Sequence, residues 1–84
     1  KDNMSKLTQP EKKKALIVRL ARVEGQLRGI QRLLDDEADC EKIAQQLAAA
    51  RKALDKSFFT MVGCMIEQES MPAEKVAAML AKFA

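Results

Sequence analysis

The chain has 84 residues, of which 48% are hydrophobic, 32% are charged and none is histidine, and its formal net charge is +3. A chain of this length forms one small domain that buries only about 60–65% of its unfolded surface, so we expect self-association. The lack of histidine excludes most zinc, nickel and cobalt sites and most pairs of a nucleophile with a general base. We therefore expect no enzymatic activity.

The positive charge is concentrated in the first part of the chain. Residues 1–35 hold nine Lys or Arg and four Asp or Glu, whereas residues 36–84 hold six and eight. An oligomer would multiply this basic region, and a polyanion such as double-stranded DNA is its natural partner, with a solvated helix face as the alternative. No apolar run is long enough to span a bilayer. We expect a cytoplasmic protein with no membrane partner and with both cysteines reduced.

The N-terminal residues 1–9 are predicted to form a tail. Within it, residues 1–3 precede Met4 and are interpreted as a leftover of cloning, with Met4 as the natural start. Residues 10–84 are predicted to form a single all-helical domain for sensing and DNA binding.

The first predicted helix begins near Pro10, because Thr8 and Glu11 have the spacing of a capping box. It runs to about Leu34. Its apolar residues recur at alternating spacings of four and three, which is typical of a helix that packs lengthwise against another. They are Leu16, Leu20, Val23, Leu27, Ile30 and Leu34.

The acidic stretch 35–39 then interrupts the pattern and supplies N-cap candidates for a second helix, over residues 39–69. Residues 70–72 mark a break, and Pro72 suits the first turn of a short third helix over residues 73–82. No segment alternates like a strand, so the sequence predicts an all-α chain with a long, a long and a short helix. The apolar pattern of the second helix is Ile43, Leu47, Ala50, Leu54 and Met61, with Phe58 and Met65 alongside.

The two cysteines, Cys40 and Cys64, lie 24 residues apart on the second predicted helix. This separation is about 36 Å, so the two thiols meet only across subunits, and an antiparallel dimer would bring the helix ends together twice. On a straight helix Met65 and Glu69 share the face of Cys40, whereas a supercoiled helix puts Cys64 in the same seam as Cys40. Both arrangements stay open, as does a role for Cys64 as a small buried hydrophobe.

Soft sulfur ligands are the one metal-binding option that the composition leaves. Thiolates and thioethers suit Cu(I), so Cys40 with Met65 or Cys64 is a candidate site for that ion. Methionines on a helix are also ordinary core residues, which is the alternative interpretation of Met65. No other cofactor is expected.

The segment RLARVEGQLRGIQRLLDDEADC, residues 19–40, closely resembles the CsoR/RcnR/FrmR family of copper-, nickel- and formaldehyde-responsive repressors, and QQLAAARKAL, residues 45–54, continues the pattern. The similarity covers residues 10–69. It implies an all-helical DNA-binding repressor without a helix-turn-helix, in which an antiparallel dimer forms a four-helix bundle and two dimers pair into a tetramer. It also implies that DNA binds across basic faces of the first two helices and that a small inducer at an inter-subunit site releases it.

The resemblance implies a sensing site at the start of the second helix. The family's cysteine there matches Cys40, its histidine 25 residues later falls on Met65, and its next ligand falls on Glu69. The chain therefore keeps one of three copper-type ligands. The persulfide-responsive subgroup uses two cysteines that cross-link between subunits, and this chain has Cys40 and Cys64. The formaldehyde-responsive subgroup uses the helix cysteine with a proline after the initiator methionine, where this chain has Ser5.

The resemblance also implies a set of basic residues that contact DNA. Phosphate contacts should dominate their affinity and give it a steep salt dependence. The residues are Arg19, Arg22, Arg51 and Lys52, supplemented by Lys12, Lys13 and Lys14.

We therefore predict a repressor that senses a persulfide, an electrophile or an oxidant at Cys40, with Cys64 of the neighbouring subunit as the second thiol. The first alternative is a Cu(I) sensor that uses Cys40 with Met65 or Cys64. The second is a formaldehyde-responsive repressor, and the non-regulatory alternative is a helical assembly module.

Overall fold

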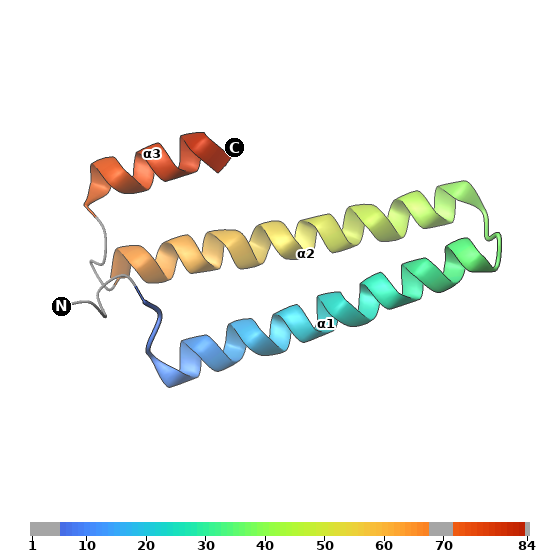
Figure 1. Cartoon of the computed structure of the whole chain (residues 1–84), viewed down its shortest axis with the longest axis horizontal. Coiled ribbons are helices and arrows are strands. Elements are labelled where there is room, and N and C mark those ends of the chain that lie inside the picture. Colours follow the sequence, from blue (N-terminus) through green and yellow to red (C-terminus); the bar gives the residue numbers. More distant parts are fainter. Residues whose placement is uncertain (1–5, 68–71, 84) are drawn as a thin grey trace.

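The computed structural model describes residues 6–67 and 72–83, which form three helices and no strand. Helix α1 spans Pro10–Asp35, α2 spans Cys40–Glu67 and α3 spans Ala73–Phe83. The first two helices form an antiparallel hairpin, and α3 folds back along the C-terminal part of α2 on the side away from α1 (Figure 1). The predicted all-α order of long, long and short helices is confirmed.

The start of α1 differs from the prediction. The N-cap residue is Gln9, not Thr8, and no side chain accepts a hydrogen bond at this cap. The reason is Pro10, which takes the first helical position, where its missing N–H costs nothing, and which holds the preceding residue in an extended conformation. The capping box of Thr8 and Glu11 is therefore wrong, although the predicted start near Pro10 is confirmed.

The turn after α1 closes by two backbone hydrogen bonds of a Schellman motif. The N–H of Glu37 donates to the carbonyl of Leu34 at 3.1 Å, and the N–H of Ala38 donates to the carbonyl of Leu33 at 2.9 Å. Glu37 has a φ of 57°, in the left-handed region that glycine usually fills. A residue with a Cβ pays about 1–2 kcal/mol there.

Helix α2 begins at a predicted cap, whereas Pro72, which was predicted in the first turn of the third helix, lies just before it. The Asp39 carboxylate accepts the N–H groups of Glu41 and Lys42, at 3.1 and 3.3 Å, so Asp39 caps α2. Pro72 stands one residue before α3, and its carbonyl accepts the first N–H bonds of that helix. The predicted break at residues 70–71 lies outside the described residues.

The contact between α1 and α2 uses only half of the predicted apolar seam. On α1, every seventh residue of the seam is buried, whereas the residues between them are 40–58% exposed. The buried positions are Leu16, Val23 and Ile30, and the exposed positions are Leu20, Leu27 and Leu34. The apolar residues of α1 therefore form two surfaces, a buried one that faces α2 and an exposed one.

The same division occurs on α2. Ile43, Ala50, Ser57 and Cys64 recur at every seventh position and are buried. Three of them are small, so α1 can approach closely. The Ser57 hydroxyl donates to the carbonyl of Ala53 at 3.2 Å, which satisfies the buried polar group.

The hairpin with α3 beside it is a thin slab of 51 × 28 × 15 Å. Since one helix with its side chains is about 10–12 Å across, the slab is a single layer of helices. Its radius of gyration is 16.3 Å, against about 12 Å for a compact domain of this length. Domains are normally built from two packed layers, so the part of the chain that the structure describes lacks a second layer. Within residues 6–67 and 72–83, no helix is long and apolar enough to cross a membrane.

Candidate functional site

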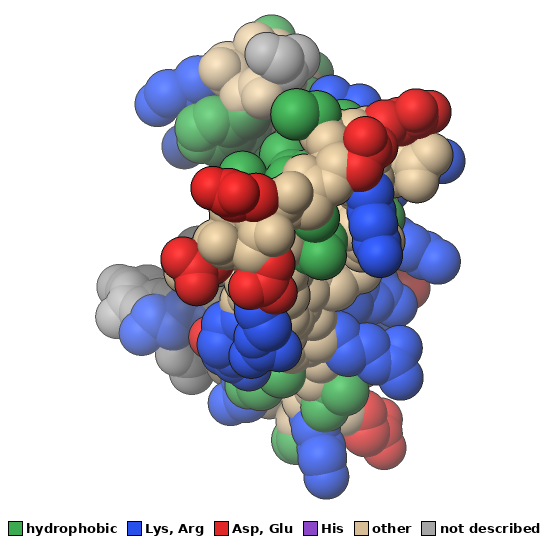
Figure 2. Space-filling model, turned by 90° about the vertical axis from the view of Figure 1, so that its right-hand side faces the viewer, with side chains coloured by type: hydrophobic (Ala, Val, Ile, Leu, Met, Phe, Trp, Pro, Cys, Tyr) green, Lys and Arg blue, Asp and Glu red, His purple; other side chains and the backbone are tan. Residues whose placement is uncertain are grey.

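Cys40 is the first residue of α2, at the connected end of the hairpin, and its side chain is exposed. Acidic side chains gather around this end, which faces the viewer in Figure 2. The acidic residues of the segment are Asp35, Asp36, Glu37, Asp39 and Glu41. A reagent can therefore reach the Cys40 thiol from solvent without any opening of the hairpin.

Cys64 lies near the other end of α2 and is only 5% exposed. It continues the seven-residue pattern of Ser57, so it faces α1. A hollow of about 240 Å³ beside it is also lined by Lys12 and Thr60. Cys40 and Cys64 therefore stand about 36 Å apart on one helix, and a single chain does not bring them together.

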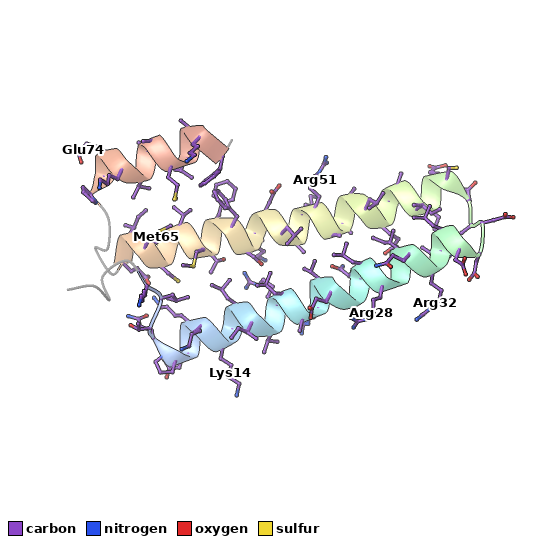
Figure 3. The ribbon with its side chains drawn as sticks, viewed as in Figure 1. Lys14, Arg28, Arg32, Arg51, Met65 and Glu74 are labelled. Carbon is purple, nitrogen blue, oxygen red and sulfur yellow. The ribbon has the colours of Figure 1, made fainter. Side chains whose placement is uncertain are left out.

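Met65 is half-buried near the C-terminal end of α2 (Figure 3). Glu69, the other residue expected beside it, lies outside the described residues. Among those that are described, no group of three His, Cys, Asp or Glu side chains could hold a metal ion. A Cu(I) site that pairs Cys40 with Cys64 or Met65 would need donors from two chains, since these residues lie near opposite ends of α2.

A row of exposed leucines follows the hairpin on one side, and we call it the outer stripe. It consists of Leu20, Leu27 and Leu34 on α1 and Leu47 and Leu54 on α2, each 40–58% exposed. Helix geometry directs all five to the same side of the hairpin. Cys40 precedes Leu47 by seven residues, so the exposed thiol lies at the end of this stripe.

Two of the predicted DNA-contacting residues connect α1 to α2. Arg19 donates through Nη1 to the Thr60 hydroxyl at 3.0 Å, and Lys12 forms an ion pair with Glu67. Thr60 and Glu67 were not predicted from the sequence. Their spacing of seven residues matches that of Lys12 and Arg19, which is the signal that could have found them.

The remaining basic residues occupy different sides of the chain. Lys14, Arg28 and Arg32 project from the side of α1 that faces away from α2, whereas Arg51 projects from α2 in the opposite direction (Figure 3). Lys13, Arg22 and Lys52 are exposed as well. A single chain therefore does not gather all of the predicted DNA-contacting residues on one surface.

The geometry is that of a helical hairpin with an exposed thiol, an uncovered apolar stripe and separate basic surfaces. Residues 12–83 match the family model for metal-sensitive transcriptional repressors. This match covers most of the chain, so the chain belongs to the metal-sensitive transcriptional repressor family. The family acts on transcription and is not enzymatic, in agreement with the prediction from the sequence. No solved structure matches the chain.

Proposed function

We propose that this protein is a cytoplasmic, homo-oligomeric repressor that leaves its DNA operator when an inducer reacts with Cys40 at an inter-subunit site. One observation carries the proposal. The exposed Cys40 lies on the same seven-residue pattern as the uncovered Leu47 and Leu54. Any second chain that covers the outer stripe therefore comes next to the thiol.

The assembly that we infer is an antiparallel dimer. A second copy would supply the missing layer on the outer stripe and complete a four-helix bundle. Its two-fold axis would set the N-terminal end of one α2 against the C-terminal end of the other, which gives two equivalent sensing sites. Pairing of two dimers into a tetramer would double the basic surface available to DNA.

The chemistry that we favour is sulfur transfer. A low-molecular-weight persulfide, RSSH, would pass its outer sulfur to the Cys40 thiolate, giving a Cys40 persulfide and RSH. The thiolate of Cys64 in the neighbouring subunit would then attack the inner sulfur, forming a disulfide and releasing hydrogen sulfide. Since Cys64 is 5% exposed, this second step needs the packing of α1 on α2 to open locally. That opening would couple sensing to the shape of the hairpin.

Cu(I) sensing is the alternative that the family membership favours, since the family is metal-sensitive. The thiolate of Cys40 with the thioether of Met65, or with the thiol of Cys64, would give a soft donor set across the dimer. Formaldehyde response is the remaining alternative, and there Cys40 would be the reacting group.

Non-reducing intact-mass spectrometry of the protein separates these chemistries after exposure to a persulfide donor or to Cu(I). Added sulfur or a cross-linked dimer that is lost in Cys64→Ala supports the cross-subunit thiol switch. Retained copper without covalent change supports the Cu(I) sensor.

A DNA-release assay tests the role of Cys40 in either chemistry. The probe is a labelled duplex that the reduced protein selects from a random-sequence pool. Cys40→Ser should bind this duplex as the parent does and should fail to release it under the inducer. A Cys40→Ser protein that responds like the parent would refute the proposal.

A further inference from the structure

The three aromatic side chains of the chain all line one hollow between α2 and α3, which we call the aromatic hollow. Its volume is about 800 Å³, within the range of about 300–1,000 Å³ that is typical of small-molecule sites. Because α3 lies beside α2 on the side away from α1, the hollow is on that side too (Figure 1). The lining residues are Leu54, Asp55, Phe58, Phe59, Leu80 and Phe83.

The aromatic rings of this hollow are accessible to a ligand. Phe59 and Phe83 are 61% and 60% exposed, so neither ring is committed to the core. Phe58 and Phe59 contact each other edge to face, with ring centroids 5.1 Å apart and an interplanar angle of 76°. This contact orients both rings. The hollow therefore presents aromatic faces, which carry partial negative charge and attract a cation.

The other charges at the aromatic hollow are negative as well. Asp55 is the one charged residue that lines it, and within the described residues no hydrogen bond or ion pair neutralises the Asp55 carboxylate. Leu80 and Phe83 belong to the last turn of α3, where the negative end of the helix macrodipole lies. The carboxylate and the helix end both favour a positively charged ligand.

One cation of the chain already contacts a ring of this set. The ammonium of Lys82 is 5.6 Å from the centroid of the Phe83 ring, within the range of a cation–π contact. Lys82 does not line the hollow, so the hollow stays open to a ligand. A bound cation would make the same kind of contact, and Lys82 would compete with it for Phe83.

We propose that the aromatic hollow binds an organic cation with an apolar body, such as a quaternary ammonium or phosphonium ion. The apolar body would be buried against Leu54 and Leu80, and the charge would lie between the rings and Asp55. A bare metal ion fits poorly, because one carboxylate does not supply the several oxygen ligands that such an ion needs. The site is about 20 Å along α2 from Cys40, and it does not depend on the proposed function.

The test measures the binding of tetraphenylphosphonium to the reduced full chain by isothermal titration calorimetry. Tetraphenylborate, an anion of nearly the same shape, is the matched probe. The parent should prefer the phosphonium, although its net charge of +3 would make non-specific binding favour the borate.

Three variants locate the binding of the phosphonium in the hollow. Asp55→Asn should weaken it roughly fivefold, because the carboxylate charge is lost. Phe59→Leu should weaken it about twofold to fivefold, since leucine keeps the apolar bulk and loses the ring. Lys82→Gln should strengthen it about twofold to fivefold, because the competing ammonium is removed.

The matched control is Glu74→Gln, which removes a carboxylate from the first turn of α3, at the end of that helix away from Phe83 (Figure 3). It should bind the phosphonium as the parent does. Equal binding by Asp55→Asn and Glu74→Gln would refute the proposal, as would a parent that prefers the borate or binds neither ion. Sedimentation tests a second copy as the occupant. If Phe59→Leu weakens self-association and leaves phosphonium binding unchanged, a second copy covers the hollow and the proposal is wrong.

Discussion

The two ends of the α1–α2 hairpin are held together in different ways. At the connected end, Ile30, Ile43 and Ala50 form a buried apolar cluster, with Leu33 and Ala38 packed against it. Each large apolar side chain buried there contributes about 1.5–3 kcal/mol. The connected end should therefore be the stable part of the chain.

The open end also buries apolar side chains, namely Leu16, Val62 and Cys64, but these lie outside the apolar cluster, and polar contacts join the two helices there as well. Lys12 pairs with Glu67, whose side chain is 61% exposed, and Arg19 donates to Thr60. Exposed ion pairs contribute about 0–1 kcal/mol. The exposed Cys40 therefore lies at the end with the buried apolar cluster, whereas the buried Cys64 lies at the end that we expect to open more readily.

The largest expected effect is that of Ile30→Ala, which removes a side chain from the buried cluster. It should lower the free energy of unfolding by about 2–5 kcal/mol, because the transfer energy of the removed atoms is forfeited and a cavity is left. Urea unfolding followed by circular dichroism measures this change. The loss in free energy of unfolding should be the same at every protein concentration, because Ile30 lies within one chain's hairpin and not between chains.

Leu27→Ala is the control for Ile30→Ala, three residues away on the outer stripe and 40% exposed in one chain. It should weaken self-association by about 1–2 kcal/mol per dimer, since the exposed two-fifths of each leucine would be buried there. Sedimentation at several concentrations measures the effect. If both variants lose the same free energy of unfolding at every protein concentration, then the seam is not divided into buried residues that face α2 and exposed residues of the outer stripe.

The next effect concerns the two thiols. In the native protein, Cys64 should react with iodoacetamide roughly 10–100-fold more slowly than Cys40, since local opening at the open end costs about 1.4–2.8 kcal/mol. Mass spectrometry of tryptic peptides over time gives both rates, and denaturant should make them equal. Equal rates in the native protein would show that Cys64 is not protected by α1.

Sequence periodicity predicted the number, order and approximate ends of the helices, because the spacing of apolar residues is a local property. It could not predict which leucines of the seam face α2. Leu16 and Leu20 have the same chemistry, and the choice depends on the register between the helices. That register follows from the turn at Glu37 and from contacts such as that of Arg19 with Thr60, which join residues far apart in the sequence.

The candidate site was predictable only in part, for the same reason. Cys40 could be predicted as a residue at the start of the second helix, and in the structure it is the first residue of α2 and is exposed. Sequence spacing left the face of Cys64 undecided, because a straight and a supercoiled helix give different answers. The hollow that Arg19, Arg22 and Lys56 line could not be predicted either, since it forms only when α2 packs beside α1.

A smaller effect is expected at the turn of the connected end. Glu37→Gly should raise the free energy of unfolding by about 0.5–1 kcal/mol, because the left-handed strain is removed and part of the gain is offset by the flexibility of glycine. Asp36→Gly is the control, since its φ of −83° is ordinary and glycine should destabilise the chain there. A drop in stability in Glu37→Gly would contradict the Schellman geometry.

The smallest effect on stability is expected for Glu67→Gln, which breaks the exposed ion pair with Lys12 at the open end. It should cost at most about 0.5 kcal/mol at low salt and less at high salt, where the ion pair is screened. Two other readouts should move more. Iodoacetamide should label Cys64 faster, because one ion pair between the helices is lost. The DNA duplex should bind more tightly, because Lys12 becomes available to contact phosphate. Lys12→Ala should also speed the labelling of Cys64, because it breaks the same ion pair, but it should weaken DNA binding. The two variants therefore distinguish the role of Lys12 in joining the helices from its role in binding DNA.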